Sequence, residues 1–203
     1  MPADRTDPVA GIVLAAGAST RMGRNKLFFR LEGETILRRA AGRATATGLD
    51  PVILVLGYEA DRARQEVAGL SCRTVVNPDY ERGINLSLRT GIAALPAETR
   101  AVVVMLADMP FVTTSMLATL VERYRSSRAP LVISDYAGVN APPMLYDRSL
   151  FPELQAMEGE GCGRQVIRRH RRDAVAVPWP AAALTDLDVP DDYERVKAQL
   201  AAG

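Results

Sequence analysis

A run of small residues followed by two basic residues stands near the start of the chain, directly after the apolar run Gly11–Ala15. Small side chains let a phosphate approach the main chain, whose N–H groups can donate hydrogen bonds to it. The guanidinium of Arg21 and the ammonium of Lys26 supply positive charge that suits a triphosphate. The residues that we expect to bind a nucleotide here are Leu14, Ala15, Ala16, Gly17, Ala18, Ser19, Arg21 and Lys26.

The spacing within this loop excludes two familiar nucleotide-binding motifs. It contains no GxGxxG, so a dinucleotide-binding loop is not supported. It contains no GxxxxGK[ST] either, because Lys26 is followed by Leu27 and not by a hydroxyl residue that would hold Mg²⁺. The alternative is a solvated turn with an incidental arginine and lysine, and the whole string of residues argues against it.

A carboxylate follows the most apolar run of the chain. Asp108 stands two residues past Ala101–Leu106, where open α/β sheets bind their ligands. A charge there costs several kcal/mol unless a partner compensates it, and Mg²⁺ is a natural partner for a carboxylate. Asp186 and Asp188 form a second candidate pair just before a predicted helix, and helix capping is the alternative for them. The sequence therefore predicts a magnesium site that includes Asp108.

Polar residues also follow the third predicted strand. Gly83 allows close approach of the backbone, while Asn77, Asn85 and Ser87 offer hydrogen bonds to a base edge or a ribose. We expect Asn77, Gly83 and Ser87 to bind the nucleotide. The alternative is an ordinary helix entrance in which Asn85 or Ser87 caps the helix.

These residues must be positioned by strands that alternate with helices. The predicted strands are Gly11–Ala15, Val52–Leu56, Cys72–Val76, Ala101–Leu106, Leu131–Ser134 and Ala174–Val177. The predicted helices are Thr35–Thr47, Glu59–Ala68, Leu86–Leu95, Thr114–Ser126 and Pro190–Ala201. The segment Ala101–Leu106 is apolar at every position, as a strand covered on both faces should be. The pattern predicts an α/β fold, with a mostly parallel sheet wrapped by helices in a single domain over residues 1–203, of which 1–8 are expected to be flexible.

The bulk composition limits the partners. The chain has 203 residues, with 25 Lys and Arg against 24 Asp and Glu, so no global charge points to nucleic acid or to an anionic membrane. Two distant cysteines give no basis for a zinc site or a disulfide framework. The polar N-terminus is unlike a signal peptide, and no apolar stretch is long enough for a membrane span. We therefore expect a cytoplasmic protein.

Four segments, taken in order, resemble the nucleotidyltransferases that modify molybdopterin, and most closely the molybdenum cofactor cytidylyltransferase family. They are Leu14–Lys26, Asn77–Leu88, Leu106–Pro110 and Asp186–Tyr193. The resemblance implies a Rossmann-like three-layer fold of the nucleotide-diphospho-sugar transferase type that binds an NTP and Mg²⁺. It also implies that Asp188 is the second metal ligand, with the choice between Asp186 and Asp188 left open.

The same resemblance implies transfer of CMP from CTP to molybdopterin with release of pyrophosphate. Arg21, Lys26 and Asp108 would be the catalytic residues, and a molybdenum oxidoreductase would be a partner. No histidine is needed, because an anionic acceptor phosphate can attack the α-phosphorus without a general base. Catalysis then reduces to alignment and charge neutralisation. The alternatives are GTP or another phosphorylated acceptor, and a non-catalytic accessory protein.

The acceptor side matches the family less well. Asn140-Ala141 stands where Gly-His or Gly-Asn is commoner, and Glu160 replaces an aspartate in the Gly-rich loop Glu158–Arg164. Cys162 in that loop is either a reactive thiol or a buried inert one. We interpret the basic cluster Arg168–Arg172, which holds the one histidine His170, as a solvated helix end in preference to a nucleic-acid site. Attraction of the acidic pterin phosphate is the minor alternative.

Overall fold

The central feature of the fold is an eight-stranded sheet. The structure, a computed structural model, describes residues 8–19, 22–127, 129–185, 187 and 190–201. Along the sheet the strand order is β10-β7-β9-β6-β1-β4-β5, with β8 paired to β7. The bounds are β1 Val9–Ala15, β4 Val52–Leu56, β5 Arg73–Val76, β6 Ala101–Leu106, β7 Leu131–Tyr136, β8 Val139–Asn140, β9 Met144–Asp147 and β10 Ala174–Trp179.

The pairing is mostly parallel, as the sequence predicts. Strand β1 pairs in parallel with both β6 and β4, and β4 pairs in parallel with β5. The exceptions are β9, which is antiparallel to β6 and β7, and the short β8, which is antiparallel to β7; neither strand was predicted. All six predicted strands are present, with ends that differ from the prediction by two residues at most. The expected fold class, a single α/β domain with a mostly parallel central sheet, is confirmed.

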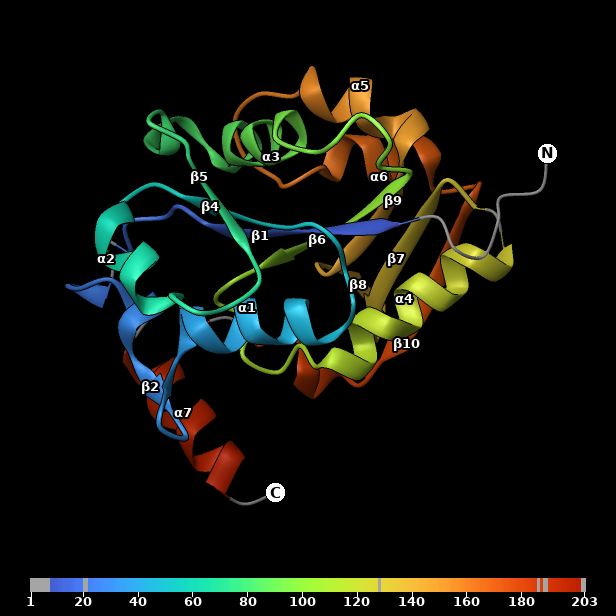
Figure 1. The fold of residues 1–203 in the computed structure, drawn as a ribbon. Coiled ribbons are helices and arrows are strands. Elements are labelled where there is room, and N and C mark those ends of the chain that lie inside the picture. The colour runs from blue at the N-terminus through green and yellow to red at the C-terminus, as the bar shows by residue number, and fades with distance from the viewer. Residues whose placement is uncertain (1–7, 20–21, 128, 186, 188–189, 202–203) are drawn as a thin grey trace.

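Helices cover both faces of the sheet. In Figure 1, α3, α5 and α6 lie on one face, while α1 and α4 lie on the other. Their bounds are α1 Ile36–Ala46, α2 Ala60–Glu66, α3 Ile84–Ala93, α4 Thr114–Ser127, α5 Phe151–Gln155, α6 Arg164–His170 and α7 Pro190–Ala201. Five of these helices were predicted, and α5 and α6 were missed. A short hairpin of β2 (Arg30–Leu31) and β3 (Glu34–Thr35) lies beside α7, where Tyr193 donates a hydrogen bond to the Arg30 carbonyl at 2.7 Å.

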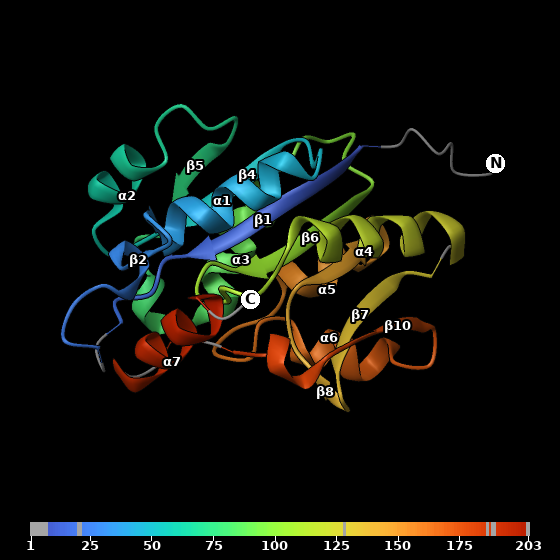
Figure 2. The same cartoon turned by 90° about the horizontal axis from the view of Figure 1, so that it is seen from below.

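The alternation of side chains along β1 explains why its residues are nearly all apolar. Val9 and Val13 pack into the core cluster that contains α1 and α4, whereas Ala10 and Ile12 pack into the cluster that contains α3. Successive side chains of a strand point to opposite faces, so a strand with helices on both sides has no solvent-facing position. The view turned by 90° shows α1 and α4 lying over the same face of the sheet (Figure 2).

The fold brings the carboxyl ends of β1, β4, β5 and β6 to one edge, because these four strands are adjacent and parallel. The loop that begins at Ala16, the residue Gly57, the segment after Val76 and Asp108 therefore meet at that edge. Among the described residues no helix is long and apolar enough to cross a membrane. The cytoplasmic location and the domain bounds stay predictions.

Candidate active site

A cavity of about 260 Å³ lies at the carboxyl edge of the sheet. Eight of the candidate site residues line it: Leu14, Ala15, Ala16, Gly17, Ser19, Lys26, Ser87 and Asp108. The other lining residues are Leu27, Tyr80, Ile84, Leu106 and Glu160. Three further candidates, Ala18, Asn77 and Gly83, do not line it. The sequence therefore predicted eight of the residues that line this cavity and did not assign the other five to the site.

Lys26 and Asp108 form an ion pair within this cavity. The Lys26 Nζ lies 2.6 Å from Asp108 Oδ2, and the side chains are only 12% and 20% exposed. Asn25 holds the start of the short helix that carries Lys26, because its side-chain oxygen accepts a hydrogen bond from the Leu27 N–H at 3.1 Å. Asp108 does not cap α4, since the Met116 N–H donates to the Thr113 hydroxyl instead. The cation and the carboxylate are thus placed together from segments 82 residues apart.

The loop after β1 presents its main chain to the same cavity. Ser19 adopts a left-handed backbone conformation with φ of 53°, and its carbonyl accepts a hydrogen bond from the Met22 N–H at 2.9 Å. Within the described part of the chain, no hydrogen-bond partner is recorded for the N–H groups of Gly17 and Ala18. Backbone N–H groups left open beside a lysine suit an anionic phosphate.

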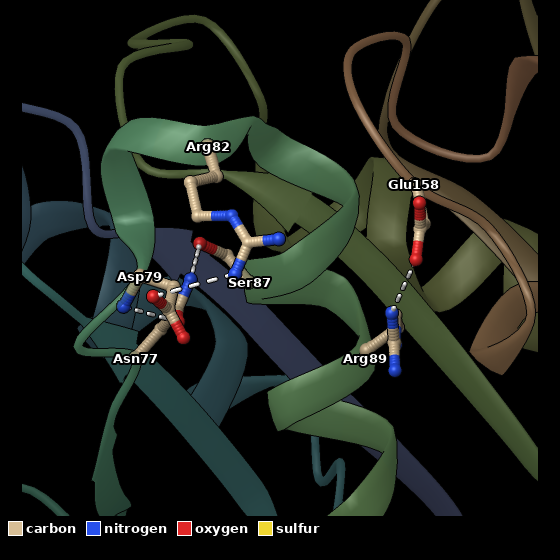
Figure 3. Close-up of polar contacts among 6 residues, drawn as sticks. All are labelled: Asn77, Asp79, Arg82, Ser87, Arg89 and Glu158. Atoms are coloured by element: carbon tan, nitrogen blue, oxygen red, sulfur yellow. Dashed lines mark hydrogen bonds and ion pairs between the residues drawn. The ribbon is translucent and has the colours of Figure 1, made fainter.

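Asn77 supports the site from behind the cavity wall. Its amide nitrogen donates to the Ser87 hydroxyl at 3.0 Å, and its oxygen accepts from the Asp79 N–H at 3.0 Å. Figure 3 shows these side chains gathered beneath the turn that carries Arg82. Asn77 is buried, and Ser87 lines the cavity. Their hydrogen bond therefore connects the segment after β5 to α3 beside the cavity.

Gly83 and Asn85 hold a distant loop against α3. A Cβ at Gly83 would lie 2.5 Å from the Gly159 carbonyl oxygen, so no side chain fits there. The fully buried amide of Asn85 donates to the carbonyls of Glu158 and Glu160, both at 3.0 Å, and accepts from the Gly163 N–H at 3.1 Å. All three bonds hold the loop Glu158–Gly163.

A second cavity of about 640 Å³ adjoins the first one. The two share Ile84, Leu106 and Glu160 in their linings. The second cavity is lined by apolar residues together with three arginines, Arg164, Arg168 and Arg171, from α6 and its end. Two members of the basic cluster therefore face a cavity, where the sequence favoured a solvated helix end. Asn140 accepts a hydrogen bond from Arg171, which ties α6 to β8.

Among the residues that the structure describes, neither Cys162 nor His170 belongs to a pair of nucleophile and base. Burial raises the pKa of the Cys162 thiol to about 12, and the negative charge of Asp108 adds to the shift. A thiol with that pKa is protonated at neutral pH and is a poor nucleophile. The His170 Nε2 lies 2.7 Å from Glu153 Oε1 on α5, and this hydrogen bond lowers the pKa of the Glu153 carboxyl.

Asp108 and Glu160 both line the first cavity, and the carboxylate of Asp108 fits a magnesium ion that takes its other ligands from water and substrate phosphates. Mg²⁺ usually uses only one or two protein carboxylates. Within the described ranges, no group of three or more His, Cys, Asp or Glu side chains could hold a metal ion. The predicted Arg21, Asp186 and Asp188 lie outside the described residues. Of the two predicted metal ligands, Asp108 is the one for which the structure gives a position.

A family model described as "MobA-like NTP transferase domain" matches residues 11–175, which include the Lys26–Asp108 pair and every lining residue of the two cavities except Leu184. This chain belongs to that family. It is a nucleotidyltransferase.

Three curated relatives span most of this nucleotidyltransferase. The purine catabolism protein PucB of Bacillus subtilis is 29% identical and covers 95% of this chain and 98% of its own. The molybdenum cofactor cytidylyltransferase of Escherichia coli is 27% identical and covers 92% and 94%. The nicotine blue oxidoreductase of Paenarthrobacter nicotinovorans is 28% identical and covers 84% and 83%. The three names differ, so the substrates do not follow from membership alone.

Solved structures of similar fold agree with the assignment of this chain to the family. Rv0371c from Mycobacterium tuberculosis superposes with a TM-score of 0.85 at 28% identity, covering 94% of this chain and 97% of its own. A manganese complex of Rv0371c superposes with a TM-score of 0.77 at the same identity, covering 94% and 98%. A divalent cation is thus present in a structure of similar fold.

Proposed function

We propose that this nucleotidyltransferase transfers CMP from CTP to molybdopterin, with Mg²⁺ as cofactor and pyrophosphate as the second product. The observation that carries the proposal is the adjacency of two cavities. The first cavity holds the loop after β1 (residues 16–19), here called the phosphate loop, together with Lys26 and Asp108. The second cavity is lined with arginines. A donor nucleotide and a phosphorylated acceptor would meet where their linings join.

Charge at the first cavity supports NTP as the donor. The Lys26 ammonium and the open N–H group of Gly17 would bind phosphate oxygens. Preorganised contacts of this kind are worth about 10²–10³ in rate each. Mg²⁺, held through Asp108, would supply further charge neutralisation at the phosphates. Arg21, whose position is not described, would add a second cation to the loop.

The second cavity supports an anionic acceptor with an apolar body. Its arginines suit a phosphate, because a guanidinium can bind two oxygens of one phosphate at once. Apolar residues of the wall, which include Met109, Val139 and Leu184, suit a ring system. Since an ionised phosphate is already a nucleophile, alignment of its oxygen with the α-phosphorus would be the main task of the site.

The choice of cytosine and of molybdopterin rests on the sequence resemblance and on the cytidylyltransferase relative. GTP or a different phosphorylated acceptor is the alternative with the same chemistry. A second candidate function is that of an accessory protein that binds a nucleotide-form cofactor for an oxidoreductase. The relatives named PucB and nicotine blue oxidoreductase favour this candidate. Molybdenum oxidoreductases would be the partners in both cases.

Pyrophosphate release separates these candidates. The protein is incubated with Mg²⁺, molybdopterin and each of the four NTPs in turn. Release that is fastest with CTP and absent without molybdopterin is the expected result. Equal or faster release with GTP would refute the cytosine assignment alone. Tight binding of one NTP with no release would favour the accessory protein.

A further inference from the structure

Tyr80 lines the nucleotide cavity without belonging to the core of the fold. It is half-buried, begins the short helix Tyr80–Arg82 after β5, and stands outside both core clusters. A second ring, Tyr58, is 41% exposed next to it, with the ring centroids 6.5 Å apart and the planes tilted by 56°. An aromatic ring at the wall of this cavity is available to a ligand.

The residue Gly57 keeps Tyr80 close to the phosphate loop. A Cβ at Gly57 would lie 2.6 Å from the Ala16 carbonyl oxygen and 2.7 Å from Cβ and Cγ of Tyr80. The next residue, Tyr58, donates its N–H to that same carbonyl at 3.0 Å. Tyr80 and Ala16 are therefore packed against a single glycine, and any side chain at this position would push them apart.

The turn that carries Tyr80 is fixed from below by polar contacts (Figure 3). Asn77 binds both the Asp79 N–H and the Ser87 hydroxyl, and the Arg82 N–H donates to the Asp79 carbonyl at 3.0 Å. The Asp79 and Arg82 side chains add an exposed ion pair at 3.6 Å. The ring is thus held in place before any ligand binds, which lowers the entropic cost of binding.

Strand order places Tyr80 on the far side of the phosphate loop from Asp108. Asp108 follows β6 and Tyr80 follows β5, while β1 and β4 lie between these two strands. A nucleotide whose phosphates lie at Lys26, Asp108 and the loop would therefore extend its base toward the β5 side. The Ser87 hydroxyl accepts from Asn77, and within the described residues its own proton has no recorded acceptor.

We propose that Tyr80 stacks on the nucleobase of the bound NTP, on the side of the cavity where the sequence already predicts that Ser87 binds the nucleotide. The inference rests on the NTP-binding part of the proposed function and is independent of the acceptor. Stacking on an aromatic ring tolerates every base. Tyr80 therefore supplies affinity for a nucleoside, while the choice among bases falls to other contacts.

The test compares NTPs with inorganic tripolyphosphate, which has the phosphates but no nucleoside. The affinities of wild type, Tyr80→Ala and Tyr80→Phe for each NTP and for inorganic tripolyphosphate are measured by calorimetry with Mg²⁺. Tyr80→Ala should weaken all four NTPs by about 5- to 150-fold, the range measured for loss of a stacking ring. It should leave tripolyphosphate binding unchanged, and Tyr80→Phe should retain NTP affinity. Tyr58→Ala is the matched control, because its ring lies outside the cavity lining.

Other results would contradict the stacking of Tyr80, the proposed reaction, or both. Unchanged NTP affinity in Tyr80→Ala, or an equal loss of tripolyphosphate affinity, would overturn the stacking assignment. A wild-type protein that binds NTPs through Tyr80 but releases no pyrophosphate with molybdopterin would refute the proposed reaction and support the inference. A wild-type protein that binds none of these ligands would refute both.

Discussion

Asn85 accepts a hydrogen bond from the backbone N–H of Gly163 at 3.1 Å, although the two residues are 78 positions apart in the chain. Together with the bonds to Glu158 and Glu160, this contact fixes the loop Glu158–Gly163 against α3. Glu160 from this loop lines both cavities. A buried amide on α3 therefore positions a residue that the proposed donor and acceptor sites share.

We expect Asn85→Leu to destabilise the protein by about 2–4 kcal/mol, because buried carbonyl and N–H groups lose their partner. Urea denaturation measures the change. The control is Arg89→Gln, which removes a 3.8 Å ion pair with Glu158 whose side chains are 39% and 80% exposed. Figure 3 shows this pair reaching from α3 to the same loop. Exposed pairs are worth little, so this variant should match wild type. Equal stability of Asn85→Leu and wild type would show that water replaces the amide.

Lys26→Ala should reduce turnover by about 10²-fold or more, because it removes a preorganised cation from the phosphate site. Steady-state pyrophosphate release at several NTP concentrations measures the effect. The exposed Lys197 on α7 provides a control, and Lys197→Ala should leave turnover unchanged. Normal kinetics in Lys26→Ala would remove this residue from the site.

Asp108→Asn should keep the fold and lose nearly all metal-dependent turnover. The substitution is almost isosteric, but it removes the negative charge that faces Lys26 at 2.6 Å and that would hold the cation. Turnover is titrated with Mg²⁺ and with Mn²⁺, and circular dichroism checks the fold. A variant that unfolds would indicate that Asp108 is a structural partner of Lys26.

Arg168→Ala should raise the KM for molybdopterin and leave the KM for CTP unchanged. Arg168 lines the second cavity, whereas its neighbour Arg169 lies 3.2 Å from Glu153 on α5. Arg169→Ala removes the same charge at the adjacent position and is the matched control. If both variants shift the KM equally, general electrostatic attraction, and not a contact in the cavity, explains the effect.

Stability should decline as the pH rises above 9, in part through Cys162. The folded protein raises the pKa of this thiol from 9.0 to about 12, mainly by burial. An unfolded chain releases the thiol proton near pH 9 while the folded chain keeps it, so rising pH favours unfolding between these values. The contribution is fully present below pH 9. Cys162→Ala should show a smaller decline in the free energy of unfolding between pH 8 and pH 10 in urea titrations, where pH 10 is about one unit above the thiol's ordinary pKa. An identical slope would contradict the assignment.

The sequence by itself determined six strands of the central sheet and the place of the cavity that holds Lys26 and Asp108. A strand covered on both faces must be apolar throughout, and Ala101–Leu106 satisfies this without any knowledge of its neighbours. The ends of such strands are marked by small or charged residues, and parallel strands share one carboxyl edge. Ala16, Lys26 and Asp108 could therefore be assigned to one cavity from local signals alone.

Only the tertiary structure decided how the rest of the wall is built. Asn85 has the same local pattern as a helix cap, but its three hydrogen bonds go to a loop more than seventy residues away. The short run Met144–Asp147 becomes a strand because β6 and β7 leave a place between them for an antiparallel partner. Arg168 faces a cavity and Arg169 faces α5, a difference set by the packing of α6. Long-range packing leaves no periodic signal in the sequence, so these side chains acquire their roles only in the folded protein.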